Sequence, residues 1–161
     1  MVPKSIQPYF NTTLQKAVGG NSIVEGELNC CNDHDFEVFV VGKTKHRFFT
    51  NTCLYPENDI VIMKVRCKRC GKIIQVFNST CDGYEHCGAR QYTDAMLEPF
   101  NCKKCRDNSF SVTIKYEYPA VQELKELGVL EVDNAFTWIW ITLKCNECGT
   151  VYRNFVDFET A

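Results

Sequence analysis

The chain has 161 residues, of which 45% are hydrophobic and 24% charged, and this balance predicts a globular protein of one domain or two small ones. The formal net charge of −2 excludes the strongly basic overall field of many nucleic-acid-binding proteins. No apolar run approaches the roughly 20 residues that a membrane helix needs, and residues 1–20 lack the apolar core of a secretory signal. We therefore expect a cytoplasmic protein with no membrane segment.

Residues 1–26 form the first predicted segment. Within it, residues 8–18 are interpreted as a short helix that stops at Gly19 and Gly20. The first repeated unit follows at 27–80.

Unit one, 27–80, is predicted to hold three strands, at 36–42, 60–66 and 72–78. Residues 81–97 form a predicted linker that contains two glycines. Four of its side chains are nevertheless suited to packing: Tyr84, Tyr92, Met96 and Leu97.

Residues 98–161 form unit two, which is also predicted to hold three strands. In 110–118 apolar and polar residues alternate, which predicts a half-buried strand. In 136–143 both faces are apolar, which favours a central strand covered on both sides. The third strand is expected at 150–158, and a proline and a glycine bracket a short helix inserted at 119–128.

The two units repeat one pattern. At 60–80 and again at 137–157, an apolar strand runs into C-x2-C-G and then into a second apolar strand. At 30–40 and 102–114, a cysteine-rich turn precedes F-x-V and a strand. The predicted fold class is therefore mainly β with short helices, and each unit is a three-stranded antiparallel sheet.

Cysteine is the compositional outlier, with 11 residues. A reducing cytosol favours metal binding over disulfides at such richness, and an odd count cannot pair completely. Three pairs have the C-x2-C spacing of a metal knuckle: Cys67/Cys70, Cys102/Cys105 and Cys145/Cys148.

This arrangement resembles the zinc-ribbon superfamily, in which two knuckles joined by antiparallel strands hold one structural zinc ion. The resemblance covers both units and implies two tandem ribbons with two Zn2+ ions per chain. The later ion would be held by Cys102, Cys105, Cys145 and Cys148. The competing interpretation, four apolar buried thiols, does not explain the repeated spacing.

The earlier site has one clear knuckle, Cys67/Cys70, and an irregular second half. Cys31 and His34 keep the x2 spacing and are the preferred ligands, whereas Cys30 is the alternative. In the plain structural interpretation, His34 is a solvated turn residue and Cys30 a packed thiol. A third ion at Cys53, Cys81, His86 and Cys87 has no recognised ligand spacing, so ordinary thiols are favoured there.

The favoured function is a non-enzymatic binding module that contacts a protein partner or a second copy of the chain. The aromatic strand of unit two is one candidate surface. Its plainer interpretation is a core that joins the two units, formed by Phe136, Trp138 and Trp140.

Two alternatives are weaker. Nucleic acid would contact a local basic run formed by Lys64, Arg66, Lys68, Arg69 and Lys72, but these cations equally well offset the charge of a thiolate-bound metal. A zinc enzyme would need an open coordination position at the earlier site, with Glu37, Asp33 or Asp35 as base. We expect no enzymatic activity.

Overall fold

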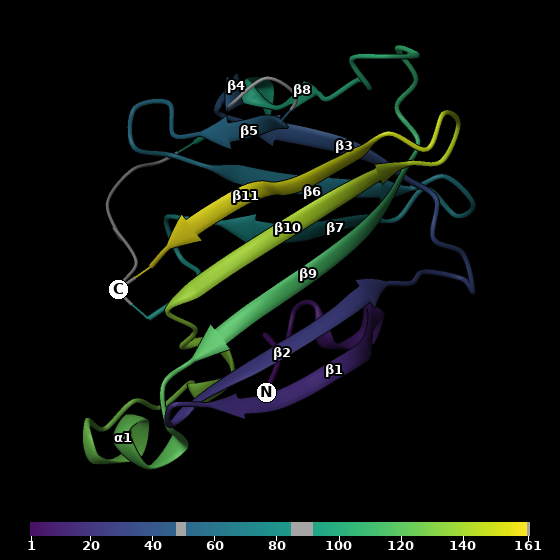
Figure 1. Ribbon diagram of the computed structural model, residues 1–161. Helices are drawn as coiled ribbons and strands as arrows, with labels where there is room; N and C mark the ends of the chain where they lie inside the picture. Colours follow the sequence, from purple (N-terminus) through teal and green to yellow (C-terminus); the bar gives the residue numbers. More distant parts are fainter. Residues whose placement is uncertain (48–50, 85–91, 161) are drawn as a thin grey trace.

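The computed structural model describes residues 1–47, 51–84 and 92–160 (Figure 1). The protein is mainly β, and the described residues contain a single short α-helix, α1 (Val121–Glu126). The strands are β1 (Phe10–Val18), β2 (Asn21–Leu28), β3 (Phe36–Val41), β4 (Lys43–Arg47), β5 (Asn51–Tyr55), β6 (Ile62–Cys67), β7 (Ile73–Asn78), β8 (Glu98–Pro99), β9 (Phe110–Tyr118), β10 (Trp138–Cys145) and β11 (Val151–Glu159). The described residues also contain three 3-10 turns: η1 (Gln7–Tyr9), η3 (Asp94–Met96) and η4 (Val132–Asn134).

The strands form two antiparallel layers. In the five-stranded layer the order is β1-β2-β9-β10-β11, and in the four-stranded layer it is β7-β6-β3-β8. The layers join at one backbone pair, Phe36 with Phe110. In Figure 1 the five-stranded layer curves across the front of the molecule with β3, β6 and β7 behind it. The β4–β5 hairpin forms a separate two-stranded sheet.

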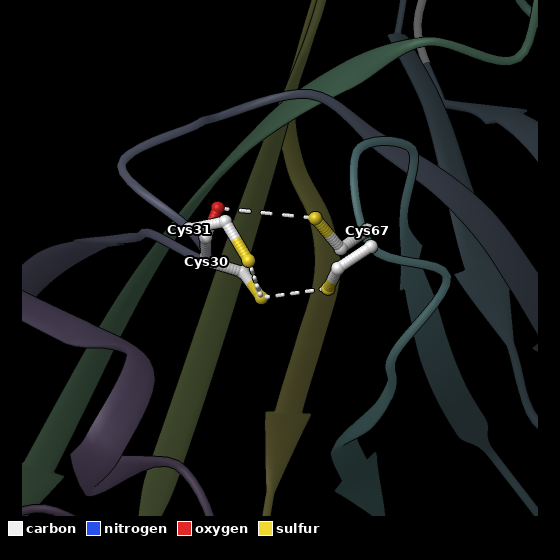
Figure 2. A group of neighbouring side chains, drawn as sticks. Cys30, Cys31 and Cys67 are labelled. Atoms are coloured by element: carbon white, nitrogen blue, oxygen red, sulfur yellow. Dashed lines mark hydrogen bonds between the residues drawn. The ribbon is translucent and has the colours of Figure 1, made fainter.

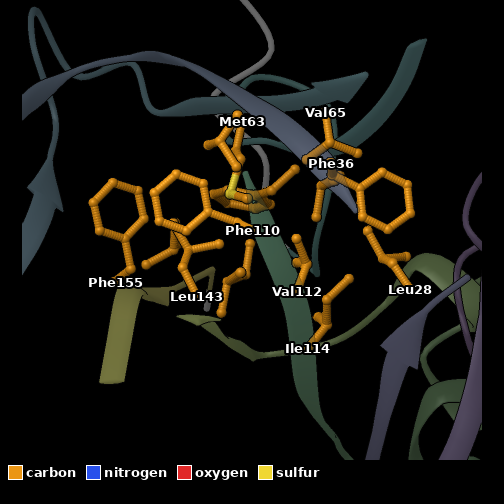
Figure 3. Close-up of a cluster of buried hydrophobic side chains, with 14 of the residues drawn as sticks. Leu28, Phe36, Met63, Val65, Phe110, Val112, Ile114, Leu143 and Phe155 are labelled. Carbon is orange, nitrogen blue, oxygen red and sulfur yellow. The ribbon is translucent and has the colours of Figure 1, made fainter. Parts of the chain in front are cut away.

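The hydrophobic core fills the space between the layers. Strand β9 shows why, because its residues alternate strictly between buried and half-exposed from Phe110 to Tyr118. Figure 3 shows the buried side chains of Met63 and Val65 from the four-stranded layer facing Val112 and Leu143 from the other layer. One continuous cluster therefore contains residues from both predicted units, 27–80 and 98–161.

The strands predicted for the two units match β3, β6, β7, β9, β10 and β11 closely. The predicted antiparallel pairing is also present, since β6 pairs with β3 and β7, and β10 pairs with β9 and β11. The inserted helix is confirmed as α1. Leu124 is fully buried, and Gly128 just beyond the helix has a φ of 72°. The eleven strands of the described residues nevertheless exceed two simple three-stranded ribbons.

The helix predicted at 8–18 is wrong, because this segment is strand β1. Gly19 and Gly20, with φ values of 57° and 94°, form the two-residue turn of a hairpin in which Val18 pairs with Asn21. The glycine pair is therefore a hairpin turn and not a helix stop. Strand β2 then pairs with β9, so the N-terminal hairpin extends the sheet of unit two.

The prediction that 136–143 is covered on both faces is also wrong. In β10 the side chains of Ile139, Ile141 and Leu143 are buried, whereas Trp138 and Trp140 are half-exposed on the outer face of the five-stranded layer. Phe136 lies just before the strand and is buried in the core. The two tryptophans therefore do not join the units. None of the helices in the described part of the chain combines the length and apolar character needed to cross a membrane.

Candidate metal centres

Two groups of four cysteines bring their sulfur atoms together. Within each group the four Sγ atoms lie within 4.8 Å of one another. Centre one contains Cys30, Cys31, Cys67 and Cys70, and centre two contains Cys102, Cys105, Cys145 and Cys148. Centre two brings together the four cysteines predicted for the later site, whereas the group at centre one contains Cys30 in place of the predicted His34.

Each centre is formed by two pairs of cysteines, and three of these four pairs lie in backbone turns of the same type. At Cys67, for example, the N–H donates to the carbonyl of Lys72, and the N–H of Gly71 donates back to the carbonyl of Cys67 at 2.8 Å. The same two bonds occur at Cys102 and at Cys145. The residue after the second cysteine is left-handed in each case, with φ values of 75°, 69° and 73° at Gly71, Arg106 and Gly149. The turn aims both sulfurs of a C-x2-C pair at one point.

The fourth pair, Cys30 and Cys31, lies in a turn of a different type. Cys30 and Asp33 exchange backbone hydrogen bonds of 3.0 Å in both directions, which closes a tight two-residue turn. Its central residues, Cys31 and Asn32, have φ values of 57° and 56°, the left-handed conformation that a mirror-image turn requires. Figure 2 shows that this turn presents the adjacent Cys30 and Cys31 toward Cys67.

His34 lies beyond this turn and is not part of centre one. Its Nδ1 lies 2.8 Å from the carbonyl oxygen of Leu28, and its Nε2 lies 3.3 Å from the side-chain amide of Asn29. Both ring nitrogens therefore have partners within the protein. Cys30, the alternative ligand, takes the place in the group that was predicted for His34. The turn brings the sulfurs of two adjacent residues together, whereas the prediction assumed two residues between the ligands.

The sulfur separations suit a tetrahedral ion. Metal–sulfur bonds of about 2.3 Å, the usual length for zinc, place tetrahedral thiolates about 3.8 Å apart. In centre one, Cys30 Sγ lies 3.8 Å from Cys31 Sγ and 3.6 Å from Cys70 Sγ. In centre two the separations are 3.6 Å for Cys102 with Cys148 and 3.5 Å for Cys105 with Cys145. All four distances are too long for disulfides, so the residues present fit a tetrathiolate ion.

Each centre is anchored in the core on one side and reaches the surface on the other. Cys67, Cys102 and Cys145 are fully buried within the main hydrophobic cluster. Cys31 and Cys70 are exposed, whereas Cys105 and Cys148 are only partly exposed. Centre one is therefore the more solvent-accessible of the two.

Hydroxyl groups support the sulfurs of centre two. The hydroxyl of Tyr152 accepts the N–H of Lys103 at 2.7 Å and lies 3.3 Å from Cys102 Sγ, so its own proton is available to the sulfur. Thr150 Oγ1 lies 3.1 Å from Cys148 Sγ. Donors of this kind orient metal-bound thiolates and disperse their charge.

The local environment divides the thiols by ease of ionisation. Burial raises the pKa of Cys30 and of Cys145 to about 12. The backbone N–H of Lys72 is the main cause that lowers the pKa of Cys70 to about 7. Burial opposes ionisation of Cys102, but the N–H of Cys105 and the Tyr152 hydroxyl outweigh it and lower its pKa to about 6. Each centre thus pairs a thiol that ionises readily with one that a cation would have to deprotonate.

The basic residues predicted as nucleic-acid contacts all have partners inside the protein. Lys64 Nζ lies 2.9 Å from a carboxylate oxygen of Asp94, and Arg66 pairs with Glu37 at 2.5 Å. The other three contact Asp35 (from Lys68, 4.0 Å), the carbonyl of Cys31 (from Arg69, 3.0 Å) and the hydroxyl of Tyr9 (from Lys72, 3.0 Å). Three of the five cations are therefore paired with carboxylates of the chain itself, which weakens the case for phosphate binding.

The carboxylates considered as catalytic bases are engaged in the same way. Glu37 pairs with Arg66, Asp33 accepts the backbone N–H of His34 at 2.8 Å, and Asp35 accepts the hydroxyl of Ser109. With four thiolates in each group, an ion would have no open position for substrate.

The residues considered for a third ion do not form a described centre. Cys53 is buried in β5, and Cys81 is exposed with its Sγ 4.0 Å from the side-chain amide of Gln75. His86 and Cys87 lie outside the described residues. No protein-family model, curated protein or solved structure matches the chain.

The two candidate ligands of centre one can be separated by substitution. Cys30→Ser is expected to lower the metal content by one ion per chain, because it removes one of four converging sulfurs. His34→Ala is expected to leave the metal content unchanged, because its ring nitrogens bond elsewhere. Elemental analysis of both purified variants checks this, and loss of one ion from His34→Ala alone would contradict it.

Proposed function

We propose that the protein is a non-enzymatic binding module built from two tandem zinc ribbons, at 27–80 and 98–161, with one structural zinc ion in each. The observation that carries this proposal is the convergence of four sulfurs at each of two centres. Sulfur-only, four-coordinate sites are typical of structural zinc in the reducing cytoplasm that we expect for this chain.

Zinc in these centres would fix the loops at the ends of β3, β6, β9 and β10. It would draw its ligands from loops that are 40 and 46 residues apart in sequence, as in Cys30 with Cys70 and Cys102 with Cys148. The ion supplies no reaction in this proposal. Its chemistry is to hold four thiolates and so to stabilise the fold.

The outer face of the five-stranded layer is the proposed contact surface for a protein partner. It carries Trp138 and Trp140, which are both half-exposed. Tryptophan side chains are on average highly buried in folded proteins. Aromatic residues on an otherwise polar face are enriched at protein interfaces. The basic residues of the four-stranded layer are already paired, which makes nucleic acid the weaker partner.

Metal content tests the zinc half of the proposal. The purified chain is expected to carry two zinc ions, measured by elemental analysis and by native mass spectrometry before and after chelation. A different metal, or a content near zero in protein prepared under reducing conditions with zinc present, would overturn it.

Surface substitution tests the binding half. Trp138→Ala with Trp140→Ala is expected to abolish capture of a specific protein by the immobilised chain. The matched control is Glu98→Gln, an exposed change on β8. Both variants should keep two zinc ions. Identical sets of captured proteins for the wild type and the double variant would contradict the assignment of this face.

A further inference from the structure

We propose that the end of the five-stranded layer around Trp138 binds an arginine side chain of the protein partner. This inference rests on the proposed function, since it names the chemistry by which the partner is recognised. Three observations support it. The two tryptophans are stacked, a lysine of the chain itself lies over the ring of Trp140, and glutamates are the cross-strand neighbours of Trp138.

The two tryptophans form an ordered aromatic platform. Trp138 and Trp140 are the only tryptophans of the chain, and both point to the outer face of β10. Their ring centroids lie 5.5 Å apart with an interplanar angle of 10°, so the rings are stacked. The indole N–H of Trp138 donates to Asp157 Oδ1 at 2.8 Å, which fixes the ring on its strand.

A cation of the protein already uses one end of this platform. Lys115, the cross-strand partner of Trp140 on β9, places Nζ 3.9 Å from the Trp140 ring centroid. This is the attraction of an ammonium group to the electron-rich face of an indole ring. The ring faces of the platform therefore attract cations, and a second cation from a partner could bind there.

The other end of the platform is surrounded by negative charge. The direct cross-strand neighbours of Trp138 are Glu117 on β9 and Glu159 on β11, and both belong to the same outer face. Asp157 adds a third carboxylate through its bond to the indole. Glu117 also accepts the side-chain amide of Asn21 on β2 at 2.8 Å, so its carboxylate is ordered on this face of the layer. No lysine or arginine is cross-strand to Trp138 in either ladder.

Arginine fits this combination better than lysine. Its guanidinium is planar and weakly hydrated, so it stacks on an aromatic ring while its edge N–H groups reach carboxylates on either side. The lysine ammonium is a compact and strongly hydrated point charge, which loses more hydration on binding. A neutral side chain would leave the carboxylates without a counter-charge.

The same face has room for the segment that carries the arginine. Beyond Trp140 the surface has two adjoining hollows that share Glu25, Thr113, Thr142 and Asn154 in their lining. Lys115 also lines the hollow next to Trp140, and Arg153 lines the other. Hydroxyl and amide groups of this kind hydrogen-bond an extended peptide backbone. The hollows lie in line with the platform, because Thr142 follows Trp140 on the same face of β10.

Tryptophan fluorescence tests the inference directly, because the only two reporters are at the site. The probe is a blocked heptapeptide with one central arginine among glycine and serine residues, titrated into the zinc-loaded chain. The controls are the same peptide with citrulline, which keeps the shape without the charge, and with lysine. We expect a saturable change with the arginine peptide, at least roughly tenfold weaker binding of the citrulline peptide, and intermediate binding of the lysine peptide.

Substitutions then locate the site. Glu117→Gln with Glu159→Gln is expected to weaken binding of the arginine peptide by about tenfold, since charged hydrogen bonds are lost at the ring edge. Glu98→Gln on β8 should leave binding unchanged. Zinc content and circular dichroism confirm that the variants are folded, so a loss of binding is assigned to the site.

Three results would overturn the inference: no saturable fluorescence change up to ~10 mM peptide, equal binding of arginine and citrulline peptides, or unchanged binding after the glutamate substitutions. If one of these results is obtained while the chain still carries two zinc ions and still captures a partner through its tryptophans, only the proposal that the face binds arginine is wrong. If capture is also independent of the tryptophans, the proposed binding face is wrong as well.

Discussion

Cys145→Ser is expected to abolish the cooperative thermal unfolding transition of the protein. Cys145 is fully buried at the end of β10, and its sulfur is one of the four of centre two. A structural zinc site contributes on the order of 10 kcal/mol or more, which equals the whole net stability of a typical domain. Differential scanning calorimetry and far-UV circular dichroism measure the loss.

The matched control is Cys53→Ser. Cys53 is a buried thiol at 3% exposure, and it lies outside both cysteine groups. Its replacement is expected to lower the melting temperature while it keeps a single cooperative transition and the full zinc content. Equal damage from the two substitutions would mean that buried thiols contribute only as packed side chains, and the metal proposal would fail.

The second large effect is expected at the junction of the layers. Phe110→Ala should lower the free energy of unfolding by about 3–5 kcal/mol, because it removes a fully buried ring and leaves a cavity. Phe110 pairs with Phe36 where the layers meet, and its ring centroid lies 5.5 Å from that of Phe100. Urea denaturation followed by circular dichroism measures the change.

Leu130→Ala provides the comparison for this experiment. Leu130 is 96% exposed, so its truncation is expected to change the free energy of unfolding by less than about 0.5 kcal/mol. The zinc content should be unchanged in both variants. A loss of zinc from Phe110→Ala would show instead that the junction is required to form the centres.

The repeated strands were predictable because their signals are local and redundant. Alternation in β9 and the C-x2-C-G knuckles before β7 and β11 occur in contiguous sequence, and each copy of the repeat supports the other. The grouping of the four cysteines of centre two was predictable for the same reason, since antiparallel pairing of β9 with β10 brings the knuckle before β9 next to the knuckle after β10.

The predictions were wrong at two kinds of position. At one, the C-x2-C spacing does not describe the ligands, and at the other, the same residues are typical of two different structures. Cys30 enters centre one through a turn with two left-handed residues, Cys31 and Asn32, and no spacing rule describes adjacent ligands. Asparagine after the cysteine pair was the available signal, because it tolerates left-handed backbone better than most residues. Gly19 and Gly20 mark a hairpin turn as readily as a helix end, and only the pairing of β1 with β2 decides between them.

The tryptophans show a limit of hydrophobic periodicity. Trp138 and Trp140 are apolar side chains, so the pattern of β10 predicts a strand covered on both faces, yet both rings are half-exposed in the described structure. An aromatic side chain with a polar N–H can be stabilised at a surface by stacking and by one hydrogen bond, as Trp138 shows here, and Trp140 shares the stacking.

The pairing of β2 with β9 has a consequence for synthesis on the ribosome. Ser22 pairs with Tyr118, so the N-terminal hairpin is translated almost a hundred residues before its neighbour β9 is complete. The β3–β6–β7 sheet can assemble as soon as Asn78 has emerged. The N-terminal hairpin is therefore incorporated into its sheet only after the β3–β6–β7 sheet can form, and until then the backbone edge of β2 that faces β9 is unpaired.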